Sequence, residues 1–208
     1  MSETVLRPGD DLRRPDVPAA AALHLRAFPA FFMASLGAPF LREFYHGFVD
    51  DPDAVTVVGR ADDGRLLGVV VGTLDPGRFF GRLLRRRGLR FAAVGALAAV
   101  RRPRTAVRLL RAVAYRGEVP GDASGALLNS ICVDPTAEHA GHGRRLIAAW
   151  WDRARERGAT SAFLVTDATG NDRVNDFYRR AGWTLVDAYT TPEGRRMNRY
   201  RRSVLDRR

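Results

Sequence analysis

Several kinds of residue are scarce in this chain of 208 amino acids, and each shortage narrows what the protein can be. The single cysteine, Cys132, excludes an internal disulfide and a zinc site built from cysteines. The four histidines stand singly, without the spacing of a metal-binding pair, so we expect no metal site. The longest strongly apolar run, from Phe91 to Val100, has about half the length of a membrane-spanning helix. Residues 1–16 are polar and have no hydrophobic signal core, so we expect a cytoplasmic protein.

Lysine is absent altogether, and all 34 basic residues are arginine, which indicates a coding bias more than a chemical need. The arginines are unevenly distributed, because the stretch from Pro76 to Gly117 contains twelve of them and no acidic residue. Subtracting those twelve from the net charge of +11 leaves −1 for the rest of the chain, which is therefore close to neutral.

This arginine-rich stretch has helical periodicity and breaks at Pro103 into two pieces. Each piece has an apolar face and arginines on its other faces, so we predict a basic helical insertion at residues 76–117. It can be a solvated helical hairpin, attract an anionic small molecule or cofactor, or bind a membrane or nucleic acid. We favour the first two over a membrane or nucleic acid as partner.

Apolar periodicity and turn residues divide the remaining chain into strands and helices. Strands are predicted at residues 4–7, 54–60, 66–74, 127–133, 161–166, 183–188 and 196–204. Helices are predicted at residues 16–28, 39–49, 141–157 and 171–181, and the aromatic segment at residues 28–39 is expected to be mainly a loop. With 46% hydrophobic residues the chain can bury one good core. We therefore predict a single α/β domain over residues 1–208, with a mixed sheet and helices on both faces.

One stretch in the middle of the chain predicts a ligand site. An apolar run from Leu127 to Val133 ends at Asp134-Pro135, and Gly141 and Gly143 then open a segment with helical periodicity. In a strand, loop and helix of this kind, the helix N-terminus presents unpaired N–H groups and the positive end of the helix dipole, and both favour a bound phosphate. A tight turn that needs glycine for a positive φ is the alternative interpretation.

A second motif follows in residues 166–183, which read TDATGNDRVNDFYRRAGW. Asn171, Val174, Phe177 and Tyr178, with Gly182-Trp183 after them, stand at the spacing of the pattern N-x-x-A-x-x-F-Y-x-x-x-G-F. Upstream, VDP is followed by eight residues that end in G-x-G. Together the two motifs resemble the Gcn5-related N-acetyltransferase (GNAT) family over residues 127–183. The resemblance implies a mixed, mostly antiparallel sheet and acetyl-CoA as the cosubstrate.

The resemblance also implies where acetyl-CoA binds. In the family the strand before the loop carries a bulge beside the thioester, which puts Ile131, Cys132 and Val133 at the cofactor. Backbone N–H groups of the loop wrap the pyrophosphate, and the loop residues here are Glu138, His139, Ala140, Gly141, His142, Gly143 and Arg144. Glu138 departs from the family, which commonly has glutamine or arginine there, because a carboxylate facing phosphate is repulsive. Asn171 is similar to the family's pantetheine-contacting asparagine, although it can equally be the N-cap of its helix.

For the chemistry, the resemblance implies that Tyr178 protonates the leaving thiolate, unless it is only a core aromatic. A phenol with a pKa of about 10 can serve a thiolate with a pKa of about 8.5 without being ionised at rest. Family members often have a glutamate base at the position of Asn129, and asparagine cannot act as that base. Either a water chain held by Asn129 and Ser130 relays the amine proton, or another side chain does, the candidates being Glu43, His46, Asp75 and Glu118. Cys132 is a packed thiol in our interpretation, and an acyl-cysteine intermediate is the less favoured alternative.

We therefore predict an acetyl-CoA-dependent N-acetyltransferase that acetylates the primary amine of a small molecule directly. An amino sugar, a nucleotide sugar or a natural-product intermediate would fit the positive charge. Phe31, Phe32 and Asn129 are expected to line the acceptor site, unless the aromatic segment is only a hydrophobic plug over the sheet. The alternatives are an enzyme for protein or peptide amines, a transferase of longer acyl groups, and a non-catalytic acyl-CoA- or nucleic-acid-binding module. The homodimer that is frequent in the family is left open.

Overall fold

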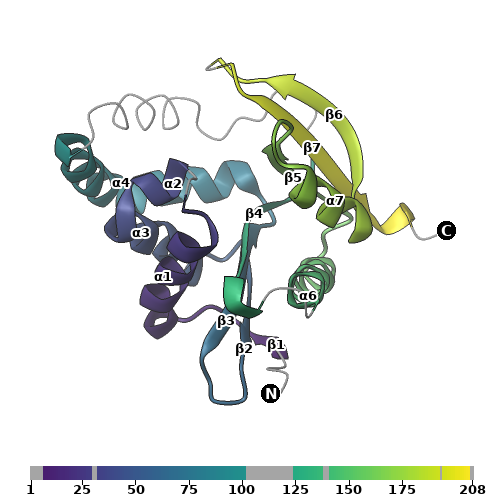
Figure 1. The fold of residues 1–208 in the computed structure, drawn as a ribbon, viewed down its shortest axis with the longest axis horizontal. Helices are drawn as coiled ribbons and strands as arrows, with labels where there is room; N and C mark the ends of the chain where they lie inside the picture. Colours follow the sequence, from purple (N-terminus) through teal and green to yellow (C-terminus); the bar gives the residue numbers. More distant parts are fainter. Residues whose placement is uncertain (1–6, 30–31, 102–123, 138–140, 193, 207–208) are drawn as a thin grey trace.

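A seven-stranded sheet forms the centre of the molecule, in the order β1-β2-β3-β4-β5-β7-β6 (Figure 1). The computed structural model describes residues 7–29, 32–101, 124–137, 141–192 and 194–206. The strands are β1 (Arg7–Asp10), β2 (Ala54–Arg60), β3 (Leu66–Thr73), β4 (Ala126–Val133), β5 (Ser161–Asp167), β6 (Thr184–Thr190) and β7 (Arg196–Ser203). Neighbouring strands are antiparallel, except that β4 and β5 are parallel. The mixed, mostly antiparallel sheet predicted from the sequence is confirmed.

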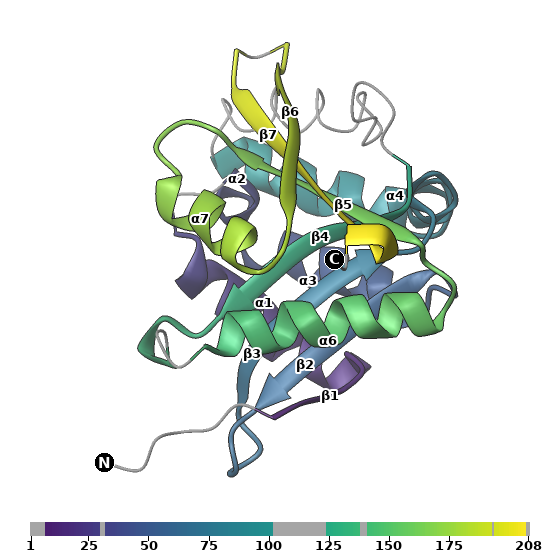
Figure 2. The same cartoon turned by 90° about the vertical axis from the view of Figure 1, so that its right-hand side faces the viewer.

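Helices cover both faces of the sheet, as Figures 1 and 2 show from two sides. One face carries α1 (Val17–Ala27), α2 (Phe32–Ser35), α3 (Gly37–Val49) and α4 (Pro76–Arg101). The other face carries α6 (His142–Glu156) and α7 (Asp172–Arg180). Short 3-10 turns lie at Arg14–Asp16, Pro135–Ala137 and Val204–Asp206.

The two faces have separate apolar cores because successive side chains of a strand point to opposite sides. In β3, Val70 packs in the core under α6, whereas Val69 and Val71 pack under α1 and α3. Trp150 of α6 is fully buried, and its Nε1 donates to a carbonyl of β2 at 3.0 Å. Gly72 of β3 permits this approach, since a Cβ there would lie 2.5 Å from the Trp150 ring.

Most elements lie where the periodicity predicts them, and the differences have local causes. The sequence predicts that the first strand ends before Pro8, but β1 continues to Asp10 and pairs Pro8 with Gly59 of β2. Proline is tolerated there because β1 is the edge of the sheet. The expected loop at residues 28–39 instead contains α2 and the first turn of α3.

The first half of the predicted basic insertion is a single helix, α4, of 26 residues. The second half, from Pro103 onward, lies outside the described residues. Within the described part of the chain, no helix is long and apolar enough to cross a membrane. The same residues contain no group of three or more histidine, cysteine or carboxylate side chains that could hold a metal ion.

Candidate active site

The parallel strands β4 and β5 pair over a short distance and then diverge. Their only paired registers in the described structure are Ala126 with Ala162 and Leu127 with Phe163, although β4 continues to Val133. Backbone N–H and C=O groups of the later part of β4 therefore have no partner strand on that side. Such an open strand edge can bind an extended ligand by backbone hydrogen bonds.

A β-bulge lies in β4 where the divergence begins. Val71 of β3 pairs with Ser130, but the next residue, Gly72, pairs with Leu128, so Asn129 is the extra residue. The bulge that the resemblance implies for this strand is thus present. The Oδ1 atom of Asn129 is buried and has no hydrogen-bond partner among the described residues. A buried amide oxygen without a partner is costly unless a ligand or water satisfies it.

The N-terminus of α6 comes close to the end of β4 and to α7. Gly141 is its N-cap residue, with φ of +71°, and no side chain caps the helix there. Gly143, in the first turn, packs so tightly that a Cβ would lie 3.1 Å from Phe177 and 3.8 Å from Val133. The first N–H groups of α6 are therefore available to an anion beside the open edge of β4.

The other predicted loop residues differ in how they are placed. Arg144 is exposed at the start of α6, as a phosphate-binding side chain requires, whereas His142 is buried. Glu138, His139 and Ala140 lie outside the described residues, so their contacts with the pyrophosphate stay predictions.

Tyr178 lies on α7 and is 7% exposed. Its ring packs against Phe177, Tyr200 and Trp183, with centroid distances of 5.2, 5.8 and 6.4 Å. Burial raises the pKa of Tyr178, and Cys132 and Tyr200 raise it further. Tyr178 therefore stays protonated at neutral pH and is a hydrogen-bond donor, although a weaker acid than a free phenol.

Asn175, which the sequence analysis did not single out, holds α7 in place. Its Nδ2 donates to the carbonyls of Asp167 and Asn171 at 3.0 and 2.8 Å. Its Oδ1 accepts from Asn198 Nδ2 and from the Tyr200 hydroxyl, both at 2.9 Å. This buried amide therefore ties α7 to the ends of β5 and β7, one turn before Tyr178.

Asn171 agrees with one of the two sequence interpretations in its position, but not in its side-chain hydrogen bonds. It occupies the N-cap position of α7, but its side chain makes no capping hydrogen bond. Its Nδ2 donates to Thr166 Oγ1 at 2.9 Å and to the carbonyl of Asp167 at 3.2 Å. The carboxamide fixes α7 to the end of β5, and its contact with pantetheine stays a prediction.

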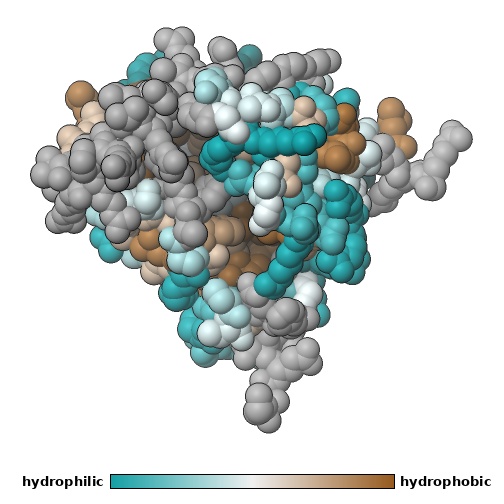
Figure 3. Space-filling view, turned by 45° about the horizontal axis from the view of Figure 1, so that its top comes forward, coloured by the Kyte–Doolittle hydropathy of each residue, from teal (hydrophilic) through white to brown (hydrophobic). Residues whose placement is uncertain are grey.

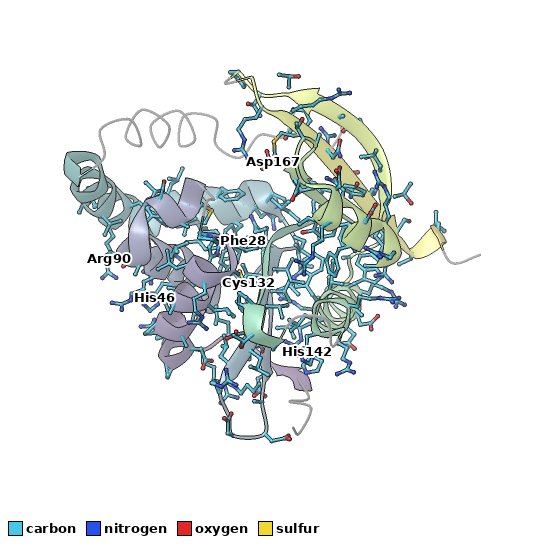
Figure 4. All side chains as sticks on the ribbon, in the orientation of Figure 1. Phe28, His46, Arg90, Cys132, His142 and Asp167 are labelled. Atoms are coloured by element: carbon cyan, nitrogen blue, oxygen red, sulfur yellow. The ribbon has the colours of Figure 1, made fainter. Side chains whose placement is uncertain are left out.

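A buried polar cluster lies on the α1 and α3 side of β4. His24 Nδ1 is 3.0 Å from the Tyr45 hydroxyl, and Cys132 Sγ lies 3.5 Å from that hydroxyl and 3.6 Å from His24 Nδ1. Ser130 Oγ completes the cluster, 3.7 Å from Cys132 Sγ. Figure 4 shows Cys132 at the centre of the molecule, where these helices meet β4. Nothing in the local sequence reveals the cluster, because it joins three elements that are far apart in the chain.

The cluster favours the interpretation of Cys132 as a packed thiol. The side chain is 1% exposed, and burial raises the pKa of Cys132 to about 11, although hydrogen bonds from Tyr45 and Ser130 lower it. A protonated, inaccessible thiol is a poor nucleophile. Burial also lowers the pKa of His24 to about 4, so the imidazole is neutral at physiological pH.

Comparison with known proteins identifies the family. Residues 19–183, most of the chain, match the family model described as the acetyltransferase (GNAT) family. This chain belongs to the GNAT family. No curated protein matches the sequence. The resemblance on residues 127–183 is thereby confirmed and extends further toward the N-terminus.

Solved structures support the same fold. A GNAT-family acetyltransferase structure from Desulfovibrio desulfuricans has 16% identity and a TM-score of 0.64, covering 96% of this chain and 99% of that one. The ribosomal-protein-S18-alanine N-acetyltransferase of Escherichia coli has 16% identity and a TM-score of 0.57, with coverage of 96% and 94%. The PaiA N-acetyltransferase of Thermoplasma acidophilum, in complex with coenzyme A, has 11% identity and a TM-score of 0.55, with coverage of 94% and 98%. At these identities the likeness concerns the fold alone.

Two of the candidate bases of this GNAT protein have other partners, and a third lies apart from β4. Glu43 forms an ion pair with Arg87 at 2.6 Å, and Asp75 accepts the backbone N–H of Arg78 at the start of α4. His46 lines a cavity between α3 and α4, and Figure 4 shows it well apart from Cys132. The contacts of Glu43 and Asp75 give these two carboxylates structural roles.

The remaining predicted residues are only partly described. Glu118 and Phe31 lie outside the described residues, and Phe32 begins α2 with its side chain outside them. Asn129 and Ser130 are the polar side chains that the bulge brings to the open part of β4.

Proposed function

We propose that this protein is an N-acetyltransferase that transfers the acetyl group of acetyl-CoA directly to the primary amine of a small molecule. The observation that carries the proposal is the bulge at Asn129, at the point where β4 diverges from β5. Membership of the GNAT family supports acetyl transfer, and the coenzyme A in the Thermoplasma acidophilum structure supports the choice of donor.

The described residues fit an extended acyl-CoA. The unpaired edge from Ile131 to Val133 offers backbone groups to the pantetheine amides, in the manner of an added strand. The uncapped N-terminus of α6 follows at the end of β4, where its N–H groups suit the pyrophosphate. Gly143 is the residue that brings this terminus against Phe177, so the phosphate end of the site depends on it.

Asn129 would orient the amine, and Ser130 would hold the water that accepts its proton. The buried Oδ1 of Asn129 accepts a hydrogen bond from the amine and orients its lone pair toward the thioester carbonyl carbon. As the C–N bond forms, the nitrogen loses a proton to a water held at Ser130, which is half-buried at the bulge. The C–S bond then breaks, and the products are the acetamide and the thiol of coenzyme A.

Tyr178 would stabilise the leaving thiolate. Because its pKa is raised, the phenol is protonated when the C–S bond breaks and donates a hydrogen bond to the sulfur. The thiolate then takes up the proton that the amine gave to the water, so coenzyme A leaves as the free thiol. The buried network of Asn175 keeps α7, and therefore this hydroxyl, in a fixed position.

The acceptor class is part of the proposal and is supported by the surface. Figure 3 shows apolar side chains in a hollow near the middle of one face, with hydrophilic side chains at its margin. A concave, mostly apolar site with a few polar groups is typical of small-molecule binding. The Escherichia coli structure is named for a ribosomal-protein substrate, so protein amines are the class against which this proposal must be tested.

The test is release of free thiol from acetyl-CoA with a panel of small primary amines and, separately, with peptides bearing free N-termini. We expect turnover with small amines, and a loss of about 100-fold in kcat for Tyr178→Phe with acetyl-CoA affinity unchanged. Tyr189→Phe, on the sheet-edge strand β6, is the control and should be as active as the wild type. Equal kcat for Tyr178→Phe would remove Tyr178 from the mechanism. Turnover with peptides alone would replace the small-molecule acceptor by a protein one.

A further inference from the structure

A cavity lies between α3 and α4, on the face of the sheet opposite to α6. The two helices are in close contact there, since a Cβ on Gly47 would lie 2.4 Å from Leu83 Cδ1. Three contacts at successive turns of α4 fix it to α3, namely Leu83 against Gly47, Arg87 with Glu43 at 2.6 Å, and the ring of Phe91 against that of Phe40 at 5.2 Å. The helices therefore form a rigid frame around the cavity.

The cavity has a volume of about 170 Å³ and a charged lining. Its charged and titratable side chains are Arg86, Arg87 and Arg90 from α4, His46 from α3, and Asp50 and Asp51 at the end of α3. Three arginines against two carboxylates make the lining cationic. Figure 4 shows His46 and Arg90 on neighbouring helices at this side of the molecule.

The carboxylates of the lining already have arginine partners that do not line the cavity. Asp51 accepts two hydrogen bonds from Arg82, at 2.6 and 2.7 Å, and Asp50 is paired with Arg14. Arg82 also pairs with Asp53 at 2.6 Å, so it is shared between two carboxylates. Glu43 neutralises Arg87 in turn. The arginines of the lining that have no ion pair with a described carboxylate are Arg86 and Arg90. The cavity thus has two guanidinium groups without a carboxylate partner among the described residues.

Arg86 and Arg90 are one turn apart on the same face of α4, where like charges repel each other. A bound anion would relieve this repulsion, and guanidinium groups bind the oxygens of phosphate and carboxylate in a forked geometry. His46 adds a third group, since its Nδ1 is buried without a hydrogen-bond partner among the described residues. A phosphate dianion offers these two guanidinium groups more charge and more acceptor oxygens than a carboxylate does.

We propose that this cavity is a phosphate site, in which Arg86, Arg90 and His46 hold the phosphate monoester of a ligand. The site is separate from the proposed acetyl-CoA site, because α3 and α4 lie on the other side of the sheet from α6. A soluble phosphorylated metabolite and the headgroup of a phosphatidic acid carry the same chemistry. The proposal does not depend on the acetyltransferase reaction.

The test is calorimetric titration with glycerol 3-phosphate, and cosedimentation with phosphatidylcholine vesicles with and without phosphatidic acid. The variant is Arg86→Gln/Arg90→Gln. The matched control is Arg85→Gln/Arg201→Gln, which removes two exposed arginines outside the cavity and changes the net charge equally. The N-terminus of α6 is present in all three proteins, so any phosphate that it binds contributes equally to each.

We expect the variant to bind at least about 10-fold more weakly than the wild type, and the control to bind like the wild type. Loss of glycerol 3-phosphate binding identifies a soluble ligand, and loss confined to phosphatidic acid vesicles identifies a lipid. Equal affinity of the two double variants, or no binding of either probe by the wild type, overturns the proposal.

Discussion

Acid should destabilise this protein through the buried side chain of His24. The imidazole is 2% exposed, and burial lowers its pKa from 6.5 to about 4. Between these two values the unfolded chain binds a proton at His24 and the folded chain does not, so stability falls as the pH falls. The pKa of Asp134 is lowered from 3.8 in the folded chain, so protonation of this carboxylate reduces the stability mainly below pH 3.8, outside this window.

The magnitude follows from the size of the shift. One pKa unit corresponds to about 1.4 kcal/mol, so His24 alone should reduce the free energy of unfolding by about 3 kcal/mol between pH 7 and pH 4. His24→Gln removes the titrating group and retains a polar side chain beside the Tyr45 hydroxyl. Its stability at pH 7 should be lower than that of the wild type, because packing and one hydrogen bond change.

Urea unfolding at pH 7, 6, 5 and 4, followed by circular dichroism, measures both proteins under the same conditions. The wild type should lose about 3 kcal/mol more than His24→Gln over this range. All other titrating groups are common to both proteins and cancel in the difference. Parallel curves of stability against pH would refute the burial of a neutral His24 beneath β4.

Three further predictions concern packing around the site. Asn175→Ala should cost about 3 kcal/mol in urea unfolding, because it removes four hydrogen bonds and leaves Asn198 Nδ2 and the Tyr200 hydroxyl without their buried acceptor. A cost below about 1 kcal/mol would contradict the network. Gly72→Ala should cost at least about 2 kcal/mol, since its Cβ would lie 2.4 Å from a backbone oxygen. Gly64→Ala, in open space with φ of +83°, should cost about 1 kcal/mol, and the reverse order would be inconsistent with the packing described. Native Cys132 should resist iodoacetamide at pH 7.5 and react only in denaturant, as mass spectrometry can establish, and rapid alkylation of the folded protein would rule out its burial.

Local patterns predict much of this fold because its elements are strongly periodic. The apolar run of β2 and the apolar stripe of α6 locate these elements to within a residue or two. The motif that contains Tyr178 predicts α7 and its neighbouring strands equally well. These are segments in which each residue's preference agrees with its environment in the fold.

The site could be predicted only where a motif marks it. The role of Asn175 depends on β5 and β7, and the cluster of His24 with Tyr45 and Cys132 depends on α1 and α3 packing against β4. Contacts between distant elements leave no periodic signal in the sequence. The α3–α4 cavity is another such case, because pairing with distant carboxylates decides which arginines remain unmatched.

Binding of acetyl-CoA at the N-terminus of α6 is the central claim, and calorimetry of Gly141→Glu against Gly158→Glu tests it most directly. Both glycines have positive φ, at +71° and +93°, and open space around them, and they lie at opposite ends of α6. The two variants therefore carry the same charge and similar backbone strain. We expect micromolar binding by the wild type and by Gly158→Glu, and none by Gly141→Glu, because its carboxylate repels the pyrophosphate. Equal binding by both variants, or no binding by a folded wild type, would contradict the account.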